Sequence, residues 1–291
     1  MSEQFLNGFE QSPKDMINLA LAMPLETKIT KAIALLKEYE RKALELHPDG
    51  YWCCDSFGKD SGVIVHLCKI SGVKHKCHHN LTTIDPPELI WFGKKNRPET
   101  VIHRPLKHML LERMVERGDP PRRIKGRWCC AEYKEADISD VVKVIGVRIV
   151  ESARRAGIWR QVQNNRNGGI IVAPIAYWTD KDVWDFHSMH NLPYCSLYDE
   201  GFKRLGCIGC PQAGTSGQRK AFARWPAYER LWRKGFQNIW DKWHGIANKK
   251  GKRRWFEKFG SADAMFDWWL SGKASDGKYS QCVFEEMMSN T

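Results

Sequence analysis

The chain has 291 residues, of which 42% are hydrophobic, enough for one large domain or for a core domain with an appendage. The N-terminal residues lack a basic start followed by an apolar block, and no stretch reaches the roughly 18 uninterrupted apolar residues of a membrane span. These features argue against a secreted or membrane-spanning protein. We therefore expect a folded, soluble, cytoplasmic protein with no membrane partner.

The net charge of +12 favours polyanionic partners. These are nucleotides in a cleft or nucleic acid over a wider surface, and charge alone does not separate the two.

The N-terminal segment, residues 1–48, contains a predicted amphipathic helix over residues 26–46. Its apolar positions fall near helical spacing with abundant charge between them; they are Ile29, Ile33, Leu36 and Tyr39. The sequence His47-Pro48-Asp49-Gly50 then breaks the helix.

A phosphate-binding loop is predicted at Ser56-Phe57-Gly58-Lys59-Asp60-Ser61, between an apolar strand at Tyr51–Cys54 and a helix that begins just after Ser61 and ends near Gly72. Such a loop exposes backbone N–H groups, and the start of the helix adds its positive dipole end. Lys59 supplies a mobile cation and the hydroxyls of Ser56 and Ser61 supply donors. Asp60 is a candidate ligand for Mg²⁺. The loop lacks the second glycine of a Walker A motif, and the alternative is an ordinary polar turn.

The elements that follow predict a doubly wound α/β fold with a mostly parallel sheet. A second strand is expected from Val73 to Ile84, followed by Pro86-Pro87 and a helix from Glu88. Further strands are expected at residues 101–102 and 141–145.

Ligands of such sheets bind beyond the carboxyl ends of the strands. We therefore expect Thr83 and Gly146-Val147-Arg148 to converge on the loop, where the Arg148 guanidinium suits phosphate or sulfate. The alternative for Arg148 is a helix cap among solvated charges such as Glu151 and Arg155.

Four of the ten cysteines form a candidate metal site, the tandem Cys129-Cys130 and the C-x-x-C of Cys207 and Cys210. Structural disulfides are not expected in the cytoplasm. A 4Fe-4S cluster offers a separate iron to each cysteine, whereas one tetrahedral zinc would strain the adjacent pair. The sequence favours a cluster, with zinc and ordinary thiols left open. Cys195 is a candidate substitute for one of the tandem pair.

The remaining cysteines have simpler interpretations. Cys53, Cys54 and Cys68 are expected in the core. Cys282 is a reactive thiol or a plain exposed cysteine.

The C-terminal region, residues 216–291, is predicted to be helical, basic and rich in tryptophan. Its large aromatic residues fall on one helical face; they are Trp232, Phe236, Trp240 and Trp243. They indicate core packing or a partner interface, and contact with nucleic acid is the alternative.

Several motifs together resemble the phosphoadenosine phosphosulfate (PAPS) reductase family of the PP-loop superfamily over residues 50–215. They are the loop, the four cysteines, Gly146-Val147-Arg148 with Glu151-Ser152, Pro174-Ile175, Trp178-Thr179-Asp180 and Val183-Trp184. The resemblance implies that residues 49–215 form a PP-loop domain in which Ser56 to Ser61 bind the phosphates of an adenine nucleotide and Arg148 faces the same anion. The cysteine pattern resembles adenylylsulfate reductases and, less strictly, Dnd-type DNA phosphorothioation proteins.

Two departures from that family bear on the reaction. Sulfonucleotide reductases carry a degenerate loop and a C-terminal Glu-Cys-Gly-Leu-His, whereas this loop is intact and Cys282 lies in Ser280-Gln281-Cys282-Val283. The intact loop resembles those of ATP sulfurylase small subunits and Dnd-type proteins, which use ATP.

The leading hypothesis is an ATP pyrophosphatase with Mg²⁺ and the cluster as cofactors. It adenylylates an acceptor oxygen with Lys59, Asp60 and Arg148 as catalytic residues, and a sulfur species then displaces AMP. One alternative is reduction of PAPS or adenylylsulfate by Cys282 or another thiol, and another is a nucleotide-sensing protein that binds nucleic acid. The partners implied are a sulfur donor such as a cysteine desulfurase or a thioredoxin-like reductant, with nucleic acid and a homodimer left open.

Overall fold

The computed structural model describes residues 13–105, 108–123, 127–135, 140–151, 153–164, 169–247 and 251–273. The chain divides into two compact units. The first comprises Met1–His79, Pro87–His103 and Asp137–Leu205, and the second comprises Asn80–Pro86, Arg104–Ala136 and Gly206–Thr291. The boundaries of these units differ from those of the segments expected from the sequence, which are residues 1–48, 49–215 and 216–291. The limits of those segments stay a prediction.

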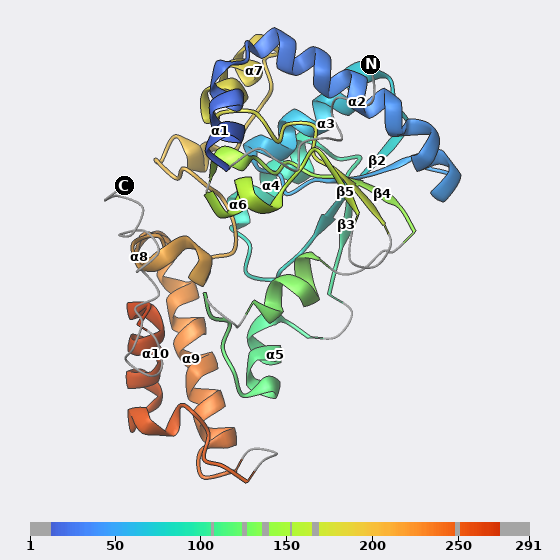
Figure 1. Cartoon of the computed structure of the whole chain (residues 1–291). Coiled ribbons are helices and arrows are strands. Elements are labelled where there is room, and N and C mark those ends of the chain that lie inside the picture. Colours follow the sequence, from blue (N-terminus) through green and yellow to red (C-terminus); the bar gives the residue numbers. More distant parts are fainter. Residues whose placement is uncertain are drawn as a thin grey trace. The chain divides into compact units, whose positions relative to one another are not determined.

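The first unit is built on a six-stranded sheet with the order β3-β2-β1-β4-β6-β5 (Figure 1). The strands are β1 (Tyr51–Cys54), β2 (His75–Asn80), β3 (Val101–His103), β4 (Val142–Val144), β5 (Val162–Asn164) and β6 (Ile170–Val172). β1 pairs in parallel with β2 and β4, and β4 pairs in parallel with β6, whereas β5 is antiparallel to β6. The predicted mostly parallel α/β fold is confirmed.

Helices enclose this sheet, and the largest core cluster joins it to α2 (Leu25–Leu46), α3 (Lys59–Ser71) and α7 (Asp180–Met189). Leu36, Ile64 and Phe186 are fully buried in that cluster. A smaller cluster contains residues of α1 (Pro13–Ala22), the 3₁₀ turn η3 (Ile149–Glu151) and α6 (Ala153–Ile158). The unit is completed by α4 (Pro87–Asn96) and η4 (Ser196–Tyr198). The amphipathic helix predicted over residues 26–46 is therefore confirmed as α2.

Two predicted boundaries are wrong. α3 begins at Lys59, inside the loop motif, rather than after Ser61. β2 ends at Asn80, although we expected the strand to continue to Ile84. The chain leaves the strand because the backbone N–H of Thr82 donates to the Asp85 carboxylate at 2.7 Å, and Thr83 adopts a φ of 69°, which extended backbone does not allow.

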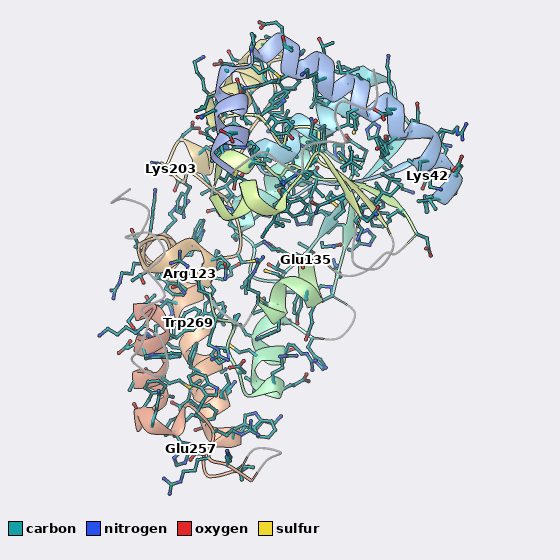
Figure 2. All side chains as sticks on the ribbon, viewed as in Figure 1. Lys42, Arg123, Glu135, Lys203, Glu257 and Trp269 are labelled. Atoms are coloured by element: carbon teal, nitrogen blue, oxygen red, sulfur yellow. The ribbon has the colours of Figure 1, made fainter. Side chains whose placement is uncertain are left out.

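The second unit is helical. Its elements are α5 (Leu110–Arg117), the π-helical turn η2 (Cys130–Lys134), η5 (Pro211–Ala213), α8 (Gly214–Arg224), α9 (Pro226–Trp243), η6 (Glu257–Phe259) and α10 (Ala262–Ser271). Trp232 stacks on Trp269 at 4.8 Å between ring centroids, and the Trp269 indole donates to the carbonyl of Pro121 at 2.7 Å. Trp269 lies on α10 and is labelled in Figure 2.

The aromatic face of α9 therefore forms core. Trp232 and Phe236 are fully buried, while Trp240 and Trp243 are half-buried. No described helix is long and apolar enough to cross a membrane.

Candidate functional site

Asp55, directly after β1, anchors the predicted loop and is only 2% exposed. Its carboxylate accepts from the backbone N–H of Phe57 at 2.8 Å and from the Thr100 hydroxyl at 3.1 Å, and it pairs with the Arg97 guanidinium. Arg97 also donates to the Ser61 hydroxyl at 3.4 Å. The buried ion pair with Arg97 thus connects the loop to the end of α4, and the hydrogen bond from Thr100 connects it to the start of β3.

Phe57 holds the loop in an unusual backbone conformation. Its φ of 60° is unfavourable for a residue with a side chain, and such strain persists only where the surroundings enforce it. The ring is buried, stacks on His79 at 4.2 Å, and packs so closely on Gly93 that a Cβ there would come within 2.4 Å of it. The packing of Phe57 therefore keeps the loop in one shape.

The loop leads into the N-terminus of α3. Gly58 caps the helix, and the backbone N–H of Lys59 donates to the Tyr198 hydroxyl at 2.9 Å. The Ser61 hydroxyl donates to the carbonyl of Gly58 at 2.9 Å and accepts from Ser56 at 3.3 Å. Because Ser56 is exposed and the helix start carries partial positive charge, this end of α3 can receive an anion.

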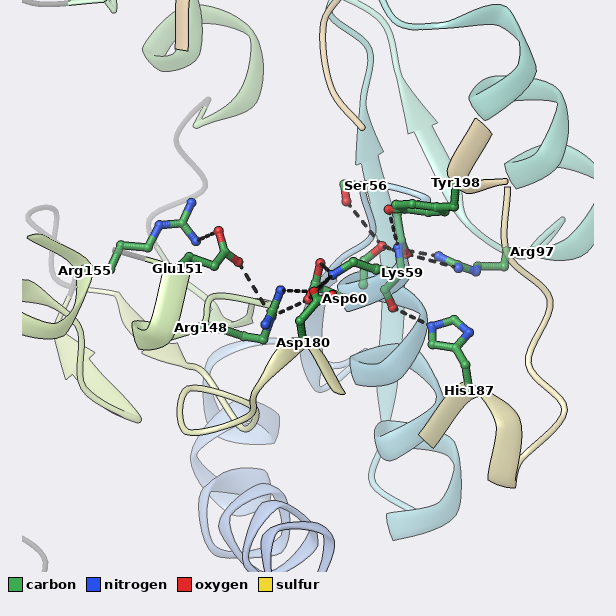
Figure 3. Close-up of polar contacts among 12 residues, drawn as sticks. Ser56, Lys59, Asp60, Arg97, Arg148, Glu151, Arg155, Asp180, His187 and Tyr198 are labelled. Carbon is green, nitrogen blue, oxygen red and sulfur yellow. Dashed lines mark hydrogen bonds and ion pairs between the residues drawn. The ribbon is translucent and has the colours of Figure 1, made fainter. Parts of the chain in front are cut away.

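Two buried cations and two carboxylates form a network beside the loop (Figure 3). The Lys59 ammonium lies 2.7 Å from Asp180 and 3.3 Å from Asp60. The Arg148 guanidinium lies 2.6 Å from Asp60 and 3.0 Å from Asp180. Lys59 and Arg148 are 3% and 4% exposed, whereas the Asp180 side chain is 62% exposed. The structure thus brings the three predicted catalytic residues together and adds Asp180.

The electrostatics of Asp180 follow from these contacts. Burial opposes its ionisation, but the hydrogen bond from Lys59 and the charges of Lys59 and Arg148 outweigh that effect and hold its pKa below the usual value. Asp180 is therefore a carboxylate at neutral pH.

Further contacts fix this network in the first unit. His187 contacts the carbonyl of Lys59 at 2.9 Å. Arg148 approaches Glu151 at 3.7 Å, and Glu151 pairs with Arg155 at 2.6 Å. A Cβ on Gly146 would come within 3.2 Å of the Asp60 backbone, so the chain after β4 lies directly against the start of α3.

Thr83 is not shown to join this network. Thr83 belongs to the second unit, where its hydroxyl accepts from the backbone N–H of Leu110 at 3.0 Å, so its role in nucleotide binding stays a prediction. Ser152 and Cys282 lie outside the described residues.

The four cysteines predicted to bind metal all belong to the second unit. The Cys207 thiol donates to the Thr82 hydroxyl at 3.3 Å. A hydrogen bond with Cys130, then burial and the charges of Cys130, Cys210 and Cys207 raise the pKa of Cys129. The same hydrogen bond and the neighbouring Arg127 lower the pKa of Cys130 to about 6. The four thiols therefore share one electrostatic environment.

The C-x-x-C turn is built around Gly209, which has a φ of 76°. A Cβ on this glycine would lie 2.6 Å from the Phe222 ring and 2.7 Å from the Trp232 indole. The backbone N–H of Ile208 donates to the carbonyl of Ile84 at 2.8 Å, and the Trp232 indole donates to the carbonyl of Ile208 at 3.1 Å. Only glycine fits this position, and the turn is anchored on the aromatic core.

The other cysteines that the structure describes lie in the first unit. Cys53 and Cys68 are fully buried, as predicted, and Cys54 is half-buried. Cys195 is buried there, and its role as a substitute ligand stays a prediction. Among the described residues, no group of three or more His, Cys, Asp or Glu side chains is placed to hold a metal ion. The positions of these cysteines therefore do not show a bound iron-sulfur cluster or a zinc site.

Sequence reasoning missed three residues of the loop site, Asp55, Arg97 and Asp180. Asp180 stood in the quoted Trp178-Thr179-Asp180, where the Thr179 hydroxyl caps α7 by accepting from Asp182 at 3.1 Å. An N-cap signal could have placed Asp180 at the start of a helix. Asp55 and Arg97 are 42 residues apart, and no local signal pairs them.

The fold and site together define an α/β protein whose loop at the start of α3 can receive an anion, and the comparison with known families specifies it further. A model of the phosphoadenosine phosphosulfate reductase domain matches residues 51–213. The chain belongs to this family.

Its relatives include enzymes of sulfonucleotide reduction. The adenosine 5'-phosphosulfate reductase of Staphylococcus haemolyticus is 26% identical over 188 residues, which are 60% of this chain and 76% of that protein. The enzyme of the same name from Staphylococcus saprophyticus is 27% identical over 200 residues, 65% of this chain and 82% of that protein. An uncharacterized 37.8 kDa protein of Escherichia phage 186 is 34% identical over 116 residues, 35% of each chain.

Among solved structures, the PAPS reductase of Candida auris covers 67% of this chain and 93% of its own, at 15% identity and a TM-score of 0.46. That likeness is too weak to bear on function. Family membership and the reductase relatives support an enzyme of the sulfonucleotide reductase family that binds a nucleotide.

Proposed function

We propose that the chain binds ATP with Mg²⁺ at the loop Ser56 to Ser61 and uses it for adenylyl transfer coupled to sulfur transfer. The observation that carries this proposal is the network in which Lys59 and Arg148 pair with Asp60 and Asp180. Two cations suit a polyphosphate, and two carboxylates suit the metal ion that accompanies it.

Each of the four residues in the network has a proposed role in binding the nucleotide. Mg²⁺ is usually bound through one or two carboxylates, waters and substrate phosphates, so Asp60 and Asp180 suffice without a third protein ligand. Asp60 and Asp180 would hold the ion, and Lys59 and Arg148 would then be free to contact phosphate oxygens. The start of α3 then adds its backbone N–H groups to the same anion.

In the proposed reaction an acceptor oxygen attacks the α-phosphorus of ATP. The bond to the bridging oxygen breaks, and pyrophosphate leaves with the bonding electrons. Lys59 and Arg148 stabilise the charge that develops on this leaving group, and their fixed positions avoid reorganisation during the step. The terminal sulfur of a donor such as a persulfide then attacks the activated centre, and AMP leaves. A dithiol reductant supplies the two electrons that cleave the remaining S–S bond and release the donor thiol.

We further propose that Cys129, Cys130, Cys207 and Cys210 hold a 4Fe-4S cluster. The proposal is supported by the mutual electrostatic influence of the four thiols, by the nearby Arg127 and by the lowered pKa of Cys130, because thiolates are the ligands. A cluster binds each cysteine through a different iron, so these ligands do not have to meet at one point, as a zinc ion requires. When bound, it would supply iron sites with affinity for sulfur.

A second candidate function is reduction of adenylylsulfate, which the reductase relatives favour. A thiolate would attack the sulfate sulfur, AMP would leave, and two electrons from a thioredoxin-like dithiol would release sulfite and restore the thiol. Cys195 is a poor nucleophile because burial raises its pKa. The candidate nucleophile is then Cys282.

The experiment that tests the proposal is anaerobic incubation of the protein with Mg²⁺ and α-labelled ATP, where water serves as the acceptor oxygen, or with adenylylsulfate and a dithiol. We expect pyrophosphate and AMP from ATP, with release lost in Lys59→Met and kept in Cys282→Ser. Sulfite from adenylylsulfate without consumption of ATP, abolished by Cys282→Ser, would overturn it in favour of the reductase.

A further inference from the structure

The two units differ strongly in charge. The second unit holds 24 Lys and Arg residues against 14 Asp and Glu, whereas the first holds 22 against 20. The second unit therefore carries +10 of the net charge of +12, although the nucleotide loop lies in the first. Nucleotide binding at that loop does not account for this excess.

Half of this excess lies on two consecutive helices, α8 and α9, which together hold seven basic and two acidic residues. α8 contains three basic residues, all exposed, and no acidic residue. On α9, Arg230 and Lys234 are exposed and lie four residues apart, on the side opposite the buried Trp232 and Phe236. We call this set the basic face; it consists of Arg219, Lys220, Arg224, Arg230 and Lys234.

Three cations of the basic face carry uncompensated charge. Within the part of the chain that the structure describes, Arg219, Arg230 and Lys234 form no ion pair. Arg233, by contrast, pairs with Glu229, Asp263 and Asp267 at 3.1 to 3.5 Å. The unpaired cations are solvated and free to exchange counterions for a polyanion.

We propose that the basic face binds the phosphate backbone of nucleic acid. The binding is independent of base sequence, because contacts with phosphates carry no sequence information. Among the described residues of this unit, the large aromatic side chains pack in its core or are half-buried, so they do not stand free to stack on bases. An anionic membrane would need an apolar helix face to insert, and the apolar face of α9 is already buried. The inference goes beyond the proposed function and does not depend on it, since it concerns a different unit.

The test is binding of fluorescent duplex DNA, in two unrelated sequences, to the full chain without ATP. We expect binding to both sequences that weakens steeply between about 50 mM and 200 mM salt. The triple variant Arg219→Glu, Arg230→Glu, Lys234→Glu should bind at least about tenfold more weakly and lower the slope of log K against log salt by about 3.

A matched control separates the basic face from net charge. The variant Lys37→Glu, Lys94→Glu, Lys95→Glu removes the same charge from exposed sites on α2 and α4 of the first unit. It should bind DNA nearly as well as the wild type, and both variants should keep the wild-type thermal unfolding temperature. Equal loss in both triple variants, binding that ignores salt, or binding to anionic vesicles but not to DNA would each overturn the proposal.

Discussion

The two units place their cations in opposite settings. In the first unit Lys59, Arg97 and Arg148 are buried, and each is paired with a carboxylate. In the second unit Arg219 and Arg230 are exposed and form no ion pair among the described residues. Buried pairs act at short range and depend on the position of each atom, whereas exposed charges act additively and are screened by salt. The first arrangement suits one small anion and the second suits a long polyanion.

The largest effect is expected where a buried pair is broken. Arg97→Met leaves Asp55 buried without its cation, which should lower the free energy of unfolding by about 3 to 5 kcal/mol in chemical denaturation. Adding Asp55→Asn should restore part of the loss, because the remaining group no longer carries a charge. Wild-type stability in Arg97→Met would show that the loop does not depend on this pair.

A comparable test in the second unit uses Gly206 and Gly209, which lie on either side of Cys207. Gly209→Ala should destabilise the protein by about 2 to 4 kcal/mol, because it adds a clash with Phe222 and Trp232 at a positive φ. Gly206→Ala is the matched control, since nothing lies within 4 Å of a Cβ there, and it should change stability by less than about 0.5 kcal/mol. Equal thermal unfolding of the two variants would contradict the packing described for this turn.

Nucleotide affinity should depend on single buried cations. Lys59→Met removes a charged hydrogen-bond donor, so the Kd for MgATP in calorimetry should rise by roughly 10- to 150-fold. This rise corresponds to a loss of about 1.5 to 3 kcal/mol of binding free energy. Lys181→Met is the control, because Lys181 is exposed and, among the described residues, its one ion pair is with Asp185 at 2.5 Å. An unchanged Kd in Lys59→Met would remove the loop from the nucleotide site.

The last effect concerns pH. Burial, and then the charge of His103, lowers the pKa of His78 from its ordinary 6.5 to about 4. The unfolded chain binds the proton more readily, so stability should fall as pH drops from about 6.5 towards about 4, by up to about 1.4 kcal/mol per pH unit. His78→Phe keeps a ring against Trp52 and should flatten that dependence in denaturation at pH 7 and pH 5. Identical slopes in both proteins would exclude His78 as the cause.

The sequence predicted the parts of the fold that depend on local pattern. The apolar strand β1, the loop and α3 lie next to one another in the chain, so composition and spacing located them. β5 and β6 were missed: β5 (VQN) contains a single apolar residue, and β6 (IIV) is a short apolar run that shows no alternating pattern. The partners that were missed in the loop site come from distant segments, since Asp180 reaches Lys59 across 121 positions. Only the fold brings such residues together.

The central claim is that the network of Lys59, Arg148, Asp60 and Asp180 binds an adenine nucleotide with Mg²⁺. The most direct test is calorimetric titration of ATP, with and without Mg²⁺, into the wild type and Asp180→Asn. We expect Mg²⁺ to tighten the binding of ATP to the wild type but not to the variant. The variant should bind metal-free ATP at least as tightly as the wild type does, because its cations have lost a competing carboxylate. Wild-type affinity that does not change with Mg²⁺ would contradict the claim.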